Sequence, residues 1–133
     1  MKRFAGRVAI VTGASTGLGP VMARMLADEG ANLVLAARRA DLVEQVAHGI
    51  GGQAIAVTAD VTQEADGDRM VAAAMDRGGQ SDVMMNNAAV PGTDKWIWEQ
   101  TPENFLTTYQ VDCMAAALCS KAVLNASMMA RKS

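Results

Sequence analysis

The chain has 133 residues and a mass of 13.9 kDa, a length typical of one domain rather than two. Hydrophobic residues make up 50% of it and charged residues 20%, which predicts a folded core. The formal net charge of −2 excludes the basic surface that nucleic-acid binding needs. No apolar run approaches the roughly 20 residues that cross a bilayer, and no secretory signal is visible, so no membrane partner is expected.

The two cysteines, Cys113 and Cys119, fall in one predicted helix, with a spacing that suits neither a disulfide nor a metal site. The single histidine, His48, adds no cluster of ligands. Both thiols are therefore expected to be free in a reducing compartment, which predicts a cytoplasmic protein without a bound metal.

The first half of the chain alternates short apolar runs with helical patterns. A β-branched run over residues 8–12 ends at a glycine and predicts a buried strand. Apolar residues at helical spacing then predict a helix that begins near Leu18 and closes at Gly30. A second strand is expected over 32–36, followed by a helix over 39–47 that stops at the next glycine.

The second half continues this alternation. Residues 53–58 predict a third strand, and Thr62 is expected to cap a helix that ends at a glycine pair. Residues 82–86 predict a fourth strand. After a loop, Thr101 and Pro102 mark the start of a long helix over 102–130. The apolar residues of this helix surround more than one face, so we expect it to be covered on two sides.

A glycine-rich segment over residues 12–19 links the first predicted strand to the first predicted helix. In that position Gly13 allows a tight turn, Gly17 lets the backbone approach a pyrophosphate, and Gly19 lets helix and strand pack closely. The start of the helix offers free N–H groups and a positive dipole end to phosphates. Together with strands that alternate with helices, the segment predicts an α/β dinucleotide-binding domain over 1–133 with a parallel sheet.

The spacing GxxxGxG resembles that of the short-chain dehydrogenase/reductase family. Asp60-Val61 follows the third strand, where the family places an aspartate on the adenine, and residues 86–89 are similar to the family's NNAG. Val111-Asp112 resembles a segment of the family's long helix. The resemblance covers essentially the whole chain but only the N-terminal half of a usual family member. It implies a Rossmann-type three-layer sandwich with strand order 3-2-1-4, in which the C-terminal strands are missing.

The same resemblance implies hydride transfer between a nicotinamide cofactor and a small alcohol or ketone. The residues expected to contact the cofactor are Gly13, Ser15, Thr16, Gly17, Leu18, Gly19, Arg38, Asp60, Val61, Asn87, Ala88 and Ala89.

NADP is favoured over NAD as the cofactor. An acidic residue at the end of the second strand would bind the ribose hydroxyls of NAD, but Ala37 stands there and Arg38 follows it. Arginine makes charge-assisted hydrogen bonds to phosphate, whereas Arg39 is expected to be a solvated charge at the helix start. Asp60 is expected on the adenine, with a simple turn or cap residue as the alternative. Asn87 is expected to contact the ribose or the backbone, with turn chemistry as the alternative.

No catalytic residue is assigned. The resemblance implies a tyrosine and lysine in a YxxxK pair and a serine, but the single tyrosine, Tyr109, is followed four residues later by Cys113. Asp112 stands at the position of the family's catalytic asparagine, where it loses the amide donors and adds a negative charge. Ala89 replaces a glycine of the family, which is a modest change.

The chain alone is therefore expected to be inactive, and two alternatives to an oxidoreductase half stay open. One is a non-catalytic dinucleotide-binding or dimerisation module, and the other is an inactive fragment. The fourth strand would have an unpaired outer edge, and exposed edges tend to associate. We expect a homo-oligomer formed through the 102–130 helix and this open edge.

Overall fold

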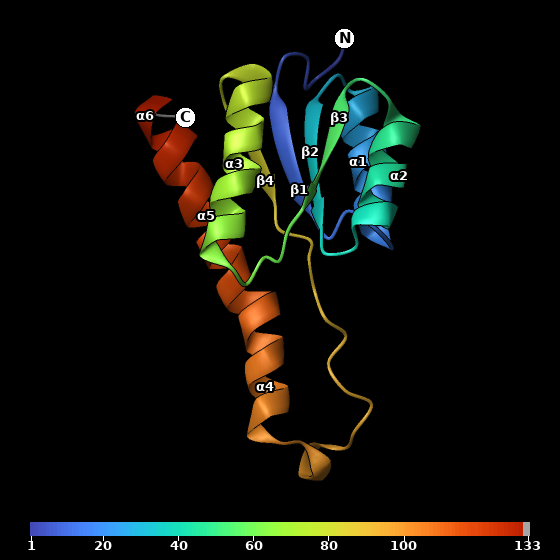
Figure 1. Ribbon diagram of the computed structural model, residues 1–133, viewed down its shortest axis with the longest axis vertical. Coiled ribbons are helices and arrows are strands. Elements are labelled where there is room, and N and C mark those ends of the chain that lie inside the picture. Colours follow the sequence, from blue (N-terminus) through green and yellow to red (C-terminus); the bar gives the residue numbers. More distant parts are fainter. Residues whose placement is uncertain (132–133) are drawn as a thin grey trace.

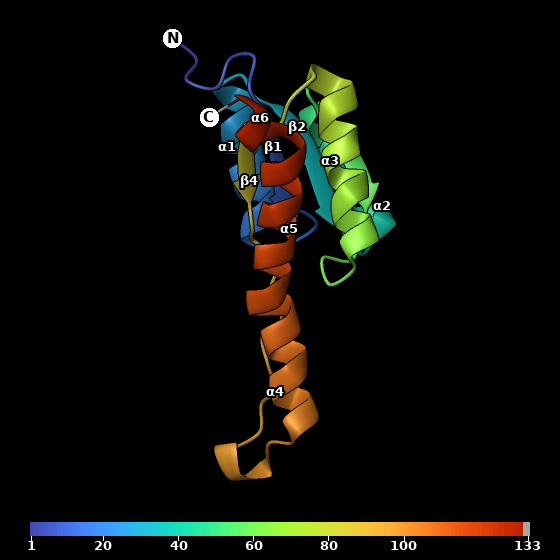
Figure 2. The ribbon, with the colours of Figure 1, turned by 90° about the vertical axis from the view of Figure 1, so that its left-hand side faces the viewer.

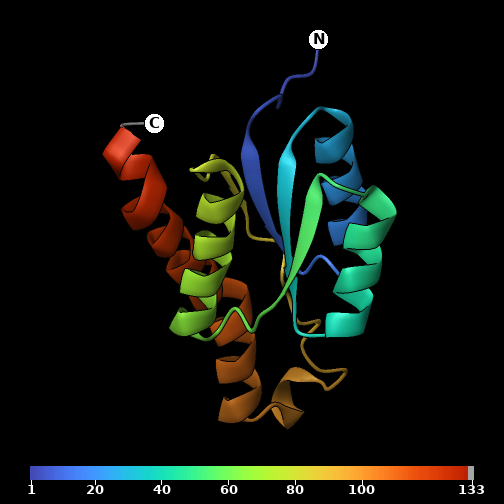
Figure 3. The same ribbon diagram turned by 45° about the horizontal axis from the view of Figure 1, so that its top comes forward.

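The computed structural model describes residues 1–131, so the last two residues of the predicted domain over 1–133 lie outside the described part. Its centre is a parallel sheet of four strands, β1 (Val8–Thr12), β2 (Asn32–Ala37), β3 (Ala54–Thr58) and β4 (Val83–Met85). Their order is β3-β2-β1-β4, which confirms the predicted fold class and strand order (Figure 3).

Helices cover both faces of the sheet. Helices α1 (Leu18–Asp28) and α2 (Ala40–Ile50) lie on one face, whereas α3 (Glu64–Gly78) and the long C-terminal helix lie on the other (Figure 1). Every residue of β1 is buried as a result. Side chains alternate along the strand, so that Ala9 and Val11 join one core cluster while Val8 and Ile10 join the other.

The long helix contains five segments that follow one another without a break (Figure 2). They are α4 (Pro102–Tyr109), the π turn η2 (Gln110–Met114), α5 (Ala115–Val123), the π turn η3 (Leu124–Met128) and α6 (Met129–Arg131). The predicted start is confirmed, because the Thr101 hydroxyl accepts a hydrogen bond from the Asn104 N–H at 3.3 Å. The two π turns were not predicted.

Among the described residues, the long helix lacks the second side of cover that its apolar residues call for. Helix α5 buries Ala115, Cys119 and Val123, but α4 projects beyond the sheet (Figure 1). Phe105 and Leu106 are 56% and 57% exposed. We call the projecting part, residues 91–109, the arm. The helix Pro102–Arg131 is also long and apolar enough to cross a membrane by length and composition alone.

Two helix boundaries differ from their predictions for local reasons. Helix α2 continues through Gly49 to Ile50, because one glycine inside a helix costs only about 1 kcal/mol. Helix α3 is not capped by Thr62, whose hydroxyl instead donates to Asp60 Oδ1 at 2.7 Å. The end of α1 is as predicted, since Gly30 has a φ of +94° just beyond the helix.

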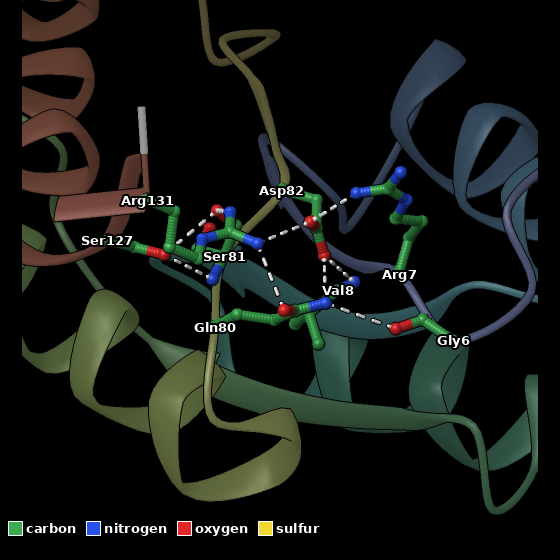
Figure 4. A network of polar contacts seen from close by, with 8 residues as sticks. All are labelled: Gly6, Arg7, Val8, Gln80, Ser81, Asp82, Ser127 and Arg131. Atoms are coloured by element: carbon green, nitrogen blue, oxygen red, sulfur yellow. Dashed lines mark hydrogen bonds and ion pairs between the residues drawn. The ribbon is translucent and has the colours of Figure 1, made fainter. Parts of the chain in front are cut away.

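Polar contacts hold the C-terminal end of the long helix to the amino edge of the sheet (Figure 4). Ser127 Oγ accepts from the Ser81 N–H at 2.9 Å and donates to the Ser81 carbonyl at 3.1 Å. Arg131, one turn further on, donates to the same carbonyl and to Asp82. These contacts fix the connection between α3 and β4.

Candidate functional site

The glycine-rich turn lies at the carboxyl ends of the strands, between β1 and α1. Gly13 and Gly17 have φ values of +62° and +65°, a region that side chains with a Cβ rarely adopt. A Cβ on Gly13 would lie 2.8 Å from Ala88 Cα, and one on Gly19 would overlap the Gly13 carbonyl oxygen. A Cβ on Gly17 would meet nothing within 4 Å, so this position faces open space where a ligand can approach the backbone.

Thr12 ties the end of β1 to the segment after β4. Its buried hydroxyl accepts from the Asn87 N–H and the Ala88 N–H, both at 3.1 Å, and donates to the Met85 carbonyl at 3.3 Å. The Asn87 amide donates to the carbonyls of Thr12 and Gly13 at 3.0 and 3.2 Å. Asn87 therefore makes the backbone contact that the sequence left open. Sequence reasoning missed Thr12, whose signal is a hydroxyl at the last position of a buried strand.

Two arginines, Arg38 and Arg39, follow β2 at the carboxyl edge of the sheet. Arg39, which directly precedes α2, is exposed as expected of a solvated charge, and it also donates from Nη2 to the Thr16 hydroxyl at 3.4 Å. Arg38 lines a cavity at the carboxyl edge of the sheet and is close enough to Asp60 to act on its charge. The side chain of Arg39 therefore connects the end of β2 to the glycine turn, a contact that the order of residues alone does not show.

Asp60 follows β3 and builds a turn. Its Oδ1 accepts from the Thr62 N–H at 2.9 Å and from the Thr62 hydroxyl at 2.7 Å, as the turn alternative requires. These hydrogen bonds and the positive charge of Arg38 hold the pKa of Asp60 below its ordinary value. Asp60 also lines the cavity beside Arg38, so its turn role leaves it at the site.

These segments surround one cavity of about 570 Å³ at the carboxyl edge of the sheet. All the predicted cofactor residues except Gly17 and Gly19 line it, and those two shape the adjoining turn. The cavity wall consists of Gly13, Ser15, Thr16, Leu18, Ala36, Ala37, Arg38, Arg39, Ala59, Asp60, Val61, Asn87, Ala88, Ala89, Val90 and Val111. Arginine and hydroxyl side chains line the end beside β2, and the start of α1 lies at the middle. Mainly apolar residues line the end after β4.

The change from a charged end to an apolar end suits a dinucleotide. The free N–H groups at the start of α1 and the open face of Gly17 fit a pyrophosphate, while the arginine end fits a ribose or its phosphate. No group of three or more potential metal ligands occurs among residues 1–131.

Asp112 and Tyr109 belong to the long helix rather than to the glycine turn. Asp112, in the π turn η2, accepts from the Val90 N–H at 2.9 Å through Oδ1, and so joins the helix to the apolar end of the cavity. Tyr109 is 52% exposed on the arm.

The family model for the short chain dehydrogenases matches residues 7–133. The chain belongs to the short-chain dehydrogenase family. An uncharacterized oxidoreductase of Methylorubrum extorquens is 36% identical over 126 residues, which are 92% of this chain and 50% of that protein. The cis-4-hydroxycyclohexanecarboxylate dehydrogenase of Sinomonas cyclohexanicum is 37% identical over 128 residues, which are 92% of this chain and 50% of that protein.

A solved structure of another short-chain dehydrogenase has the same fold. The 3-ketoacyl-(acyl-carrier-protein) reductase from Brucella melitensis, complexed with NADH, matches with a TM-score of 0.87 and 34% identity. The match covers 92% of this chain and 50% of that one. The chain thus spans about half the length of the relatives it matches, and what it shares with them includes the sheet and the glycine turn.

Proposed function

We propose that this short-chain dehydrogenase chain binds NADP(H) and is the cofactor-binding half of an oxidoreductase that interconverts a small alcohol and its ketone. The observation that carries the proposal is the convergence of four strand ends on one cavity beside the glycine turn. When bound, the cofactor supplies or accepts the hydride. The residues of this chain bind and orient it.

The preference for NADP over NAD rests on the arginine end of the cavity. Arg39 lies beside the Thr16 hydroxyl and Arg38 lines the same cavity, while Ala37 leaves no carboxylate at that position to repel a 2′-phosphate. The Brucella reductase was solved with NADH, so the fold alone does not decide between the two forms. The side chains at the end of β2 therefore decide the preference in this chain.

Arg39→Ala is expected to weaken NADPH binding about tenfold to a hundredfold, because a charge-assisted hydrogen bond contributes roughly 1.5–3 kcal/mol. NADH binding should change less than threefold. Titration calorimetry with both cofactors measures this. Arg24→Ala is the matched control, since Arg24 is an exposed arginine of α1 outside the cavity. Equal losses for NADPH and NADH would contradict the NADP preference, and no NADPH binding at millimolar concentration would contradict the nucleotide site.

A second candidate function, a non-catalytic binding or dimerisation module, is favoured by Tyr109, which lies away from the cavity on the exposed arm. We infer that this half alone binds NADPH without oxidising it in the presence of ketones. The two free thiols, Cys113 and Cys119, suit the cytoplasm, where we place the protein.

We further propose that the chain forms a homo-oligomer through the helix over 102–130. The helix exposes a stripe of large apolar residues, including Leu106, Met114 and Leu124, and such surfaces mark contacts between proteins. Sedimentation velocity should show a dimer for the natural chain and a monomer for Leu124→Glu. The matched change Val21→Glu on the exposed face of α1 should leave the dimer intact. A monomeric natural chain would contradict the proposal.

A further inference from the structure

The cavity has a direction, because residues that follow β2 and β3 line one end and residues that follow β4 line the other. If the proposed function holds, the 2′-phosphate lies at Arg38 and Arg39 and the pyrophosphate at the glycine turn. The nicotinamide half then extends toward the opposite end, which Val90 and Val111 line. Asp112 lies next to Val111 in sequence and binds the backbone of Val90. It is the carboxylate that the long helix brings to this end.

Among residues 1–131, the carboxylate of Asp112 has no cationic partner. The ion pairs among residues 1–131 involve other side chains, and the one hydrogen bond to Asp112 comes from the neutral Val90 N–H through Oδ1. Its charge is therefore not neutralised within the described part of the chain. The family resemblance places a neutral asparagine at this position, so the charge is a property of this chain.

We propose that Asp112 biases the cavity toward the oxidised form of the nicotinamide cofactor. The nicotinamide ring carries a positive charge when oxidised and none when reduced, whereas the phosphates and the adenine are unchanged. A carboxylate beside the ring end attracts the oxidised ring by Coulomb's law and leaves the reduced ring unaffected. Asp112 is thus a residue that sets the relative affinity for the two forms, and it positions the Val90 segment as well.

The charge and the positioning can be separated, because Asp112→Asn keeps an oxygen that accepts from the Val90 N–H and removes the charge. We expect this variant to bind NADP⁺ about threefold to tenfold more weakly and to bind NADPH as before. Equilibrium titrations followed by calorimetry give both dissociation constants and need no turnover. In the natural chain, the ratio of the two constants should also move toward that of the variant as salt is raised.

Asp76→Asn is the matched control. It removes one negative charge from an exposed position near the end of α3, at the opposite edge of the sheet, and should leave the ratio unchanged. Asp112→Ser serves as a second uncharged variant where the asparagine variant folds poorly. A ratio that stays the same in the uncharged variants would overturn the inference, even if both forms bind more weakly. Absence of binding by the natural chain would instead refute the proposed function.

Discussion

Gly19→Ala is expected to destabilise the fold by about 3 kcal/mol and to abolish nucleotide binding. A Cβ at this position would overlap the Gly13 carbonyl oxygen and lie 2.8 Å from Ala14 Cα. Both atoms belong to the backbone of the turn, so the overlap is relieved only by moving α1 away from β1. That movement opens the phosphate-facing turn and loosens the packing of the buried strand. Urea denaturation measures the first effect, and NADPH titration measures the second.

The same substitution at Gly49 is the matched control. Gly49 lies in the last turns of α2, is exposed, and would place its Cβ 3.8 Å from the Arg24 guanidinium, an ordinary contact. Because alanine favours the helix, Gly49→Ala should stabilise the chain by about 0.5–1 kcal/mol. The two variants are thus expected to shift the urea midpoint in opposite directions. An unchanged midpoint for Gly19→Ala would show that the turn and helix are not in close contact.

The sheet and its helices could be predicted because their signals are local. A β-branched run such as 8–12 has few alternatives once glycine follows it, and Thr101-Pro102 specifies a helix start by its own capping chemistry. The glycine turn is equally local, since each glycine is required by backbone geometry at its own position. The strand order came from the family resemblance, and the sheet confirms it.

The features that sequence reasoning missed depend on how distant segments meet. Nothing adjacent to Arg39 in the sequence shows that it reaches Thr16, and nothing near Thr12 shows that it binds the backbone of Asn87. Arg38 alone was predicted to contact the cofactor because of its distance along the chain from the glycine turn. Both arginines in fact line the cavity. The π turn η2 was missed for the same reason. It contains Asp112, whose side chain accepts a hydrogen bond from Val90 in the segment after β4.

Asp82→Ala is expected to cost about 3 kcal/mol of stability, although Asp82 is remote from the nucleotide cavity. Its side chain is only 5% exposed and accepts from the Val8 N–H at 2.8 Å, from Arg7 at 2.9 Å and from Arg131 at 3.0 Å (Figure 4). Gln80 donates to it as well, at 2.9 Å. Alanine would leave these donors without their shared acceptor where β1, β4 and the end of the long helix meet.

Glu29→Gln provides the matched comparison for Asp82→Ala. Glu29 pairs with Arg3 across the surface, where the side chains are 32% and 73% exposed. Surface pairs contribute less than about 1 kcal/mol, so this variant should unfold close to the natural midpoint in urea. Equal losses for the two variants would show that Asp82 stabilises no more than a surface charge does.

The contribution of Asp82 should also depend on pH in one direction. Burial by itself raises the pKa of this carboxyl, but hydrogen bonds from the Val8 N–H, Arg7 and Arg131 lower it more, and the net pKa lies below its ordinary value. A carboxyl whose pKa is lower in the folded chain binds its proton more readily when unfolded. Its stabilisation is therefore complete above the unfolded pKa of about 3.9 and is lost as the pH falls through the folded value.

The stability difference between the natural chain and Asp82→Asn, measured by urea denaturation, isolates this dependence. Asparagine cannot ionise, yet it is close in size and keeps one acceptor oxygen. We expect the difference to be constant from pH 7 to about pH 5 and to shrink as the pH falls below about 4. A difference that is the same in acid as at neutral pH would mean that the stabilisation comes from shape and hydrogen bonding alone. A shrinking difference would show that the negative charge of Asp82 itself holds the two arginines, and with them the end of the long helix, against the sheet.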